Sequence, residues 1–92
     1  MTGEPASSAG GPMITVHLRY FAQLREQAHA GAEKITTRAA SPAELYEEVR
    51  ARHGFALPAN ALKVAVNQQF SDWNAPLREG DTVVFIPPVN GG

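Results

Sequence analysis

The chain ends in two consecutive glycines, Gly91 and Gly92, a short distance after the Pro87-Pro88 pair. A C-terminal carboxyl group has a pKa of about 3.5 and is ionised at neutral pH, so it becomes an acyl donor only after activation, for example as an acyl-adenylate. Glycine has no Cβ, and a Gly-Gly backbone can therefore enter a narrow channel. The prolines favour an extended approach, which lowers the entropy lost on threading. The alternative is a frayed terminus whose glycines are incidental.

Other kinds of chemistry find little support in the sequence. The 92 residues include no cysteine, which excludes a disulfide framework, a thiolate zinc site and a cysteine nucleophile. The histidines lack metal-ligand spacing, and no Gly-rich phosphate loop is present. A net charge of -1 argues against a nucleic-acid partner, and no run reaches the roughly 20 apolar residues that span a bilayer. We expect no bound metal or cofactor, no membrane partner, and a reducing, cytoplasmic location.

The length allows one domain, because a second could not bury a core of its own. Residues 1–12 are rich in Gly, Pro, Ser and Ala and are predicted to form a disordered extension. Residues 13–88 form the predicted domain, and residues 89–92 a flexible Gly-Gly tail.

Five segments have the character of strands. Met13–Tyr20 alternates apolar and polar residues and predicts a half-buried strand. Thr82–Ile86 is dense in β-branched and aromatic residues and predicts a central strand buried on both faces. Shorter strands are expected at Lys34–Arg38, Leu62–Val66 and Phe70–Trp73. A turn over residues 67–69 joins the last two, with Asn67 able to take a positive φ.

Two helices are expected between these strands. The main helix covers residues 42–53: Ser41 and Glu44 form a capping box before it, and Gly54 is its left-handed C-cap. A short helix is expected over residues 21–29. The order of elements predicts an α+β fold, a β-grasp (ubiquitin-like) roll with a mixed sheet of about four or five strands and one main helix. The first and last strands are expected to be parallel neighbours at its centre.

Four runs of the sequence resemble the MoaD family, within the MoaD/ThiS group of ubiquitin-like sulfur carriers. They read YFAQLRE, VAVNQ, PLREGDTVVFIPPV and VNGG, and the resemblance covers residues 13–92. The ending GD-x-V-x-F-x-PPV-x-GG is its most specific part. MoaD is the small subunit of molybdopterin synthase and is no enzyme on its own.

The resemblance implies a role for the terminus. Gly92 would be adenylated by a MoeB-like E1 enzyme that uses ATP, and then converted to a thiocarboxylate. The tail would enter a MoaE-like large subunit within a heterotetramer and donate sulfur to cyclic pyranopterin monophosphate, which forms the dithiolene of molybdopterin. The residues that accompany Gly92 in the channel would be Gly91, Asn90, Val89 and Pro88.

The resemblance also implies a docking patch. Phe21, Phe70 and Ile86 would form the apolar surface that contacts the partners. The alternative is that all three belong to the core.

Three other functions remain open at this point. The chain could carry sulfur for another pathway, such as thiazole synthesis, as a ThiS-like carrier, or cysteine synthesis. It could be a ubiquitin-like modifier joined to lysines through Gly92, or a plain β-grasp interaction module. Isopeptide-linked conjugates would favour the modifier.

Overall fold

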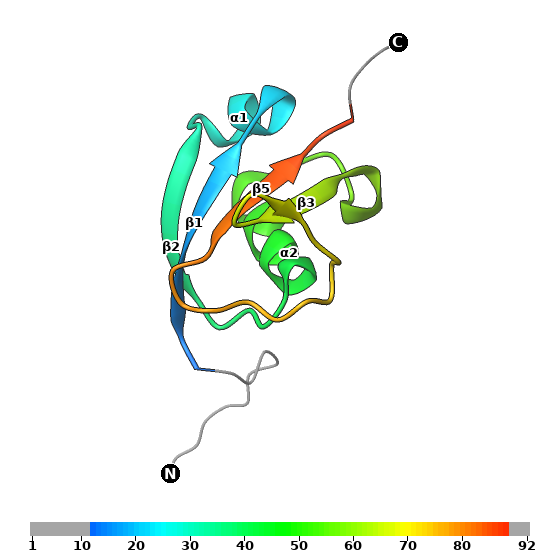
Figure 1. Cartoon of the computed structure of the whole chain (residues 1–92). Coiled ribbons are helices and arrows are strands. Elements are labelled where there is room, and N and C mark those ends of the chain that lie inside the picture. Colours follow the sequence, from blue (N-terminus) through cyan, green and yellow to red (C-terminus); the bar gives the residue numbers. More distant parts are fainter. Residues whose placement is uncertain (1–11, 89–92) are drawn as a thin grey trace.

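The computed structural model describes residues 12–88, and the predicted extension and tail lie outside this range except for Pro12. Five strands form one sheet in the order β2-β1-β5-β3-β4 (Figure 1). In chain order the elements are β1 (Ile14–Tyr20), α1 (Ala22–Ala28), β2 (Ala32–Thr37), α2 (Pro42–His53), the 3-10 turn η1 (Ala59–Ala61), β3 (Lys63–Val66), β4 (Gln69–Phe70) and β5 (Thr82–Ile86).

The topology confirms the predicted β-grasp roll. β1 and β5 are parallel neighbours at the centre of the sheet, whereas β2 pairs antiparallel with β1 and β3 pairs antiparallel with β5. Helix α2 lies against one face of the sheet (Figure 1). We call this the helix face and the opposite side the bare face. None of the described helices is long and apolar enough to cross a membrane.

The core lies between the helix face and α2. Alternate residues of β1 and β5, among them Leu18, Val83 and Phe85, point toward the helix and are fully buried. Leu45 and Val49 of α2 meet them. Tyr46 of α2 is also fully buried, and its ring packs edge-on against Phe85.

Helix α2 begins and ends as its sequence predicts, with one difference. The Glu44 amide donates to the Ser41 hydroxyl at 3.3 Å, but the Glu44 carboxylate accepts from the Ala40 amide at 2.8 Å instead of from Ser41. The capping box is therefore shifted by one residue on its return side. At the other end Gly54 takes the left-handed conformation with φ 74°.

Two expectations about the strands were wrong. The strand expected over Phe70–Trp73 is the two-residue β4, because the chain turns away after Ser71 and carries Trp73 to the aromatic core. β5 is not buried on both faces: Val83 and Phe85 are buried, but Val84 and Ile86 are half-buried on the bare face. No helix covers that side of the sheet in the described part of the chain (Figure 1).

Candidate functional site: an apolar patch at the C-terminal end of the last strand

The strand register gathers apolar residues on the bare face. Val84 of β5 lies opposite Ala65 of β3, and Ala65 lies opposite Phe70 of β4. Ile86 is two residues beyond Val84 and points to the same side. Phe21 follows β1 in extended conformation (φ -130°, ψ 159°), so it continues the bare-face row of that strand beside Ile86.

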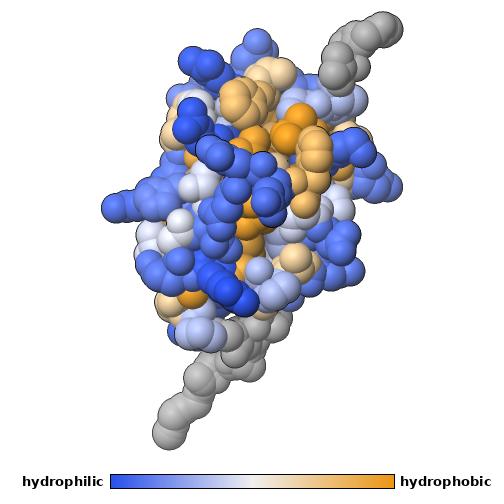
Figure 2. Space-filling model, in the orientation of Figure 1, coloured by the Kyte–Doolittle hydropathy of each residue, from blue (hydrophilic) through white to orange (hydrophobic). Residues whose placement is uncertain are grey.

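These five residues form one surface, which we call the apolar patch: Phe21, Ala65, Phe70, Val84 and Ile86. The side chains at its two ends are the most accessible, because Phe21 is 46% exposed and Phe70 75% exposed. Figure 2 shows apolar side chains gathered in the upper part of this view. The predicted residues Phe21, Phe70 and Ile86 therefore share one face, and none of the three is fully buried.

A tight turn sets the position of Phe70. Asn67 and Gln68 have φ values of 52° and 73°, the pair of positive φ angles that a two-residue hairpin turn of type I′ requires. The Asn67 side chain fixes this turn to the start of β5, because its Oδ1 accepts from the Thr82 amide and its Nδ2 donates to Asp81, both at 2.9 Å. The hairpin therefore presents Phe70 at a defined place on the sheet edge.

A backbone bend sets the position of Phe21. Ala22 has a φ of 52°, in the left-handed region that costs a non-glycine residue about 1–2 kcal/mol. This bend leads the chain from β1 into α1, whose Leu24 is fully buried. Phe21 stays exposed at the junction, between Tyr20 and Leu24, which are both fully buried.

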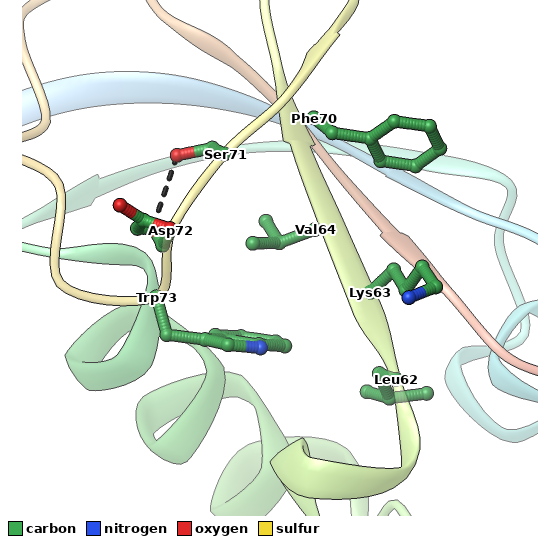
Figure 3. Close-up of a pocket in the computed structure, with 7 residues that line it drawn as sticks. All are labelled: Leu62, Lys63, Val64, Phe70, Ser71, Asp72 and Trp73. Atoms are coloured by element: carbon green, nitrogen blue, oxygen red, sulfur yellow. Dashed lines mark hydrogen bonds between the residues drawn. The ribbon is translucent and has the colours of Figure 1, made fainter.

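A groove lies beside Phe70 along β3. Figure 3 shows its lining: Lys63 and Phe70 lie to one side of the strand, and Val64 and Trp73 to the other. The indole of Trp73 stacks on Phe85 with ring centroids 6.0 Å apart and an interplanar angle of 4°. Because β4 is only two residues long, it leaves this part of the β3 edge uncovered.

The chain leaves the sheet directly from the apolar patch. β5 ends at Ile86, Pro87 is buried, and Pro88 is exposed. Neither proline has an N–H, so the ladder cannot continue past this point. The predicted tail residues Val89, Asn90, Gly91 and Gly92 lie outside the described residues, and their roles remain predictions.

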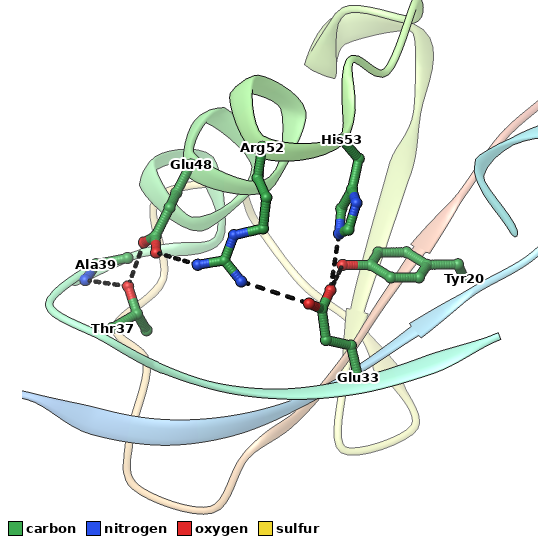
Figure 4. Close-up of polar contacts among 7 residues, drawn as sticks. All are labelled: Tyr20, Glu33, Thr37, Ala39, Glu48, Arg52 and His53. Carbon is green, nitrogen blue, oxygen red and sulfur yellow. Dashed lines mark hydrogen bonds and ion pairs between the residues drawn. The ribbon is translucent and has the colours of Figure 1, made fainter. Parts of the chain in front are cut away.

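A polar cluster lies on the helix face, and no sequence pattern predicted it. The Glu33 carboxylate of β2 accepts from Tyr20 Oη at 2.8 Å, contacts His53 Nε2 at 2.9 Å and pairs with Arg52 at 3.4 Å (Figure 4). Burial alone would raise the pKa of Glu33, but the hydrogen bonds from His53 and Tyr20 and the charges of His53 and Arg52 outweigh it and lower that pKa. Burial, together with the bond to Glu33, raises the pKa of Tyr20.

This cluster ties α2 to β2 and does not resemble a reactive centre. Arg52 also pairs with Glu48 at 3.7 Å, and Thr37 donates to the same carboxylate. Tyr20 is only 1% exposed. The partners of Glu33 lie 13 to 20 residues away from it in the sequence, so no local pattern signals the cluster. Among residues 12–88 no group of His, Asp and Glu could hold a metal ion.

Comparison with known proteins shows the family of this chain. The model of the ThiS family matches residues 18–92, which include β5 and the Gly-Gly end. The chain belongs to the ThiS family. A relative from Escherichia coli, named molybdopterin synthase sulfur carrier subunit, is 34% identical over 80 residues, which cover 84% of this chain and 99% of the relative.

Two solved structures have folds similar to that of this chain. A putative molybdopterin converting factor subunit 1 from Pyrococcus furiosus is 29% identical, with a TM-score of 0.68 over 83% of this chain and 99% of the other. A chain from Helicobacter pylori, solved as a protein-protein complex of subunits 1 and 2 of molybdopterin-converting factor, is 28% identical. Its TM-score is 0.60 over 86% of this ThiS-family chain and 100% of the other.

Proposed function

We propose that this chain is the sulfur carrier of a molybdopterin synthase, the small subunit that donates sulfur in molybdenum cofactor biosynthesis. The observation that carries the proposal is the continuity of the apolar patch with the chain end. Ile86 belongs to the patch, and Pro88 is exposed two residues later. A partner that docks on the patch therefore receives the four residues that follow, ending in Gly91 and Gly92.

The chemistry of the carrier needs only the terminal carboxylate. That carboxylate attacks the α-phosphorus of ATP on a MoeB-like activating enzyme, which releases pyrophosphate and leaves an acyl-adenylate on Gly92. A sulfur donor then displaces AMP, and the product is a thiocarboxylate. The activating enzyme binds ATP, so the carrier itself requires no cofactor. The catalytic groups belong to the partners, and the chain is not an enzyme on its own.

The second partner is a MoaE-like large subunit. The subunit 1 and 2 complex of the Helicobacter pylori relative supports such a partner for this chain. In the proposed complex Phe21, Phe70 and Ile86 contact the large subunit. The segment from Pro88 to Gly92 occupies a channel, where the thiocarboxylate transfers its sulfur to cyclic pyranopterin monophosphate.

Intact mass analysis tests the proposal. The full chain is incubated with ATP, a MoeB-like enzyme and a sulfur source, and its mass should rise by the exchange of one oxygen for one sulfur. A variant that lacks Gly92 and a variant with one residue added after Gly92 should remain unchanged while keeping the native circular dichroism spectrum. An unmodified wild-type chain, or an isopeptide-linked adduct in place of the thiocarboxylate, would contradict it.

A further inference from the structure

Charge is divided unequally between the two faces of the sheet. Glu33 is the one acidic residue in the described strands, and its carboxylate lies on the helix face, where Tyr20 and His53 contact it. The basic residues of the strands lie instead on the bare face. They are His17, Arg19, Lys34 and Lys63, and all are exposed. The charged strand residues of the bare face are therefore all basic, although the protein has a net charge of -1.

The register places these cations around the apolar patch. Arg19 lies directly beside Val84 on one neighbouring strand, and Lys63 lies directly beside Ile86 on the other. Lys34 lies opposite His17, two residues before Arg19 in β1, and so stands further from the patch. We call Arg19, Lys34 and Lys63 the basic rim. Arg19 and Lys63 border the patch on the two sides of β5.

The basic rim is not used within the fold. Among residues 12–88 none of its three side chains makes a hydrogen bond or an ion pair. The arginines of α2 differ, because Arg50 donates to the Phe55 carbonyl and Arg52 pairs with Glu33 and Glu48. Cations that stabilise no internal contact beside an exposed apolar surface are typical of an interface that steers a partner of opposite charge.

We propose that the basic rim is the electrostatic part of the docking surface and binds carboxylates of the large subunit. The partner surface would have an apolar centre that covers the patch, bordered by Asp and Glu side chains that face Arg19 and Lys63. This inference rests on the proposed function, because it takes the large subunit as the occupant of the bare face. Electrostatic complementarity of this kind acts mainly on the association rate.

The test is the association rate of the full chain with the large subunit of the same organism, measured at low and at high salt. Arg19→Glu and Lys63→Glu should each slow association several-fold at low salt, and the double variant by about tenfold or more. High salt should remove most of the difference, because exposed charges are then screened. The neutral pair Arg19→Gln and Lys63→Gln should give an intermediate rate.

Arg78→Glu is the matched control, because Arg78 is exposed in the loop before β5 and the substitution changes the net charge equally. It should change the rate less than about twofold. Equal rates for all three charge reversals would overturn the inference while the proposed function stands. If the wild-type chain does not bind the large subunit at all, both fail. Binding of a single-stranded RNA oligonucleotide that the reversals abolish, with unchanged kinetics toward the large subunit, would also overturn it.

Discussion

The two faces of the sheet are built from alternate residues of the same strands, yet they have opposite characters. Val83 is completely buried against α2, whereas its neighbour Val84 is half-buried on the bare face. Tyr20 is buried beside Glu33, whereas Arg19 is exposed beside Val84. The helix face therefore provides most of the stability of the domain, and the bare face is accessible to a binding partner.

The aromatic residues divide in the same way. Tyr20, Tyr46, Phe55, Trp73 and Phe85 contact one another on the helix face. Phe21 and Phe70, on the bare face, make no ring contact with another described residue. Two exposed phenylalanines on so small a domain are more than scattered surface apolar residues, because the register places them on one surface.

The largest stability effect is expected from a matched pair of substitutions on β5. Val83→Ala should lower the free energy of unfolding by about 2–3 kcal/mol, because it removes buried methyl groups and leaves a cavity. Val84→Ala should cost less than about 1 kcal/mol, because that side chain is half-exposed. Urea unfolding of both variants measures the difference. Equal losses would show that the bare face is part of the core.

The reverse pattern is expected for binding. Phe70→Ala should weaken association with the large subunit by more than about 1 kcal/mol, as for an interface hot spot. Its free energy of unfolding should change by less than about 0.5 kcal/mol. Calorimetric titration and urea unfolding of the same variant measure both quantities. Unchanged affinity, or unfolding of the variant, would remove Phe70 from the docking surface.

A smaller effect is expected from the polar cluster on the helix face. Glu33→Gln should lower the free energy of unfolding by about 1 kcal/mol at pH 7, because the amide keeps the Tyr20 bond but loses the negative charge that pairs with Arg52. The folded-state pKa of Glu33 is lowered from its ordinary value of 4.5. Its contribution is therefore present above pH 4.5 and is lost as the pH falls through the folded-state pKa.

Unfolding measurements between pH 7 and pH 3 check this dependence. The wild type and Glu33→Gln should converge at the acid end. Glu47→Gln is the matched control, because Glu47 is exposed on α2 and has no hydrogen bond or ion pair with this cluster, and it should follow the wild type throughout. A constant difference between wild type and Glu33→Gln over the whole range would contradict the assignment of the charge to this cluster.

Local sequence patterns predicted most of the elements, and the order of elements predicted that β1 and β5 are parallel neighbours. The caps of helix α2 and the alternation of β1 are each contained within a few residues. The structure therefore has both elements nearly as predicted. β4 was predicted to end at Trp73 but ends three residues earlier at Phe70, because Trp73 packs against Phe85 and Tyr46, a contact between distant segments. The Glu33 cluster was missed for the same reason.

The candidate site was predicted in part. The family resemblance named Phe21, Phe70 and Ile86, and the register explains why they share one face. The basic rim could not be found from the sequence, because Arg19 and Lys63 are 44 positions apart and become neighbours of the patch only through their pairing with β5.

The central claim is that Gly92 carries the sulfur, and sulfur transfer by a tail-extended variant tests it most directly. The variant with one residue added after Gly92 is supplied with ATP, the activating enzyme, a sulfur source, the large subunit and cyclic pyranopterin monophosphate, beside the wild type. The wild type should form molybdopterin. The variant should fold and bind the large subunit through the apolar patch but form no product, because it has no free carboxylate at Gly92. Normal turnover by the folded variant would contradict the account.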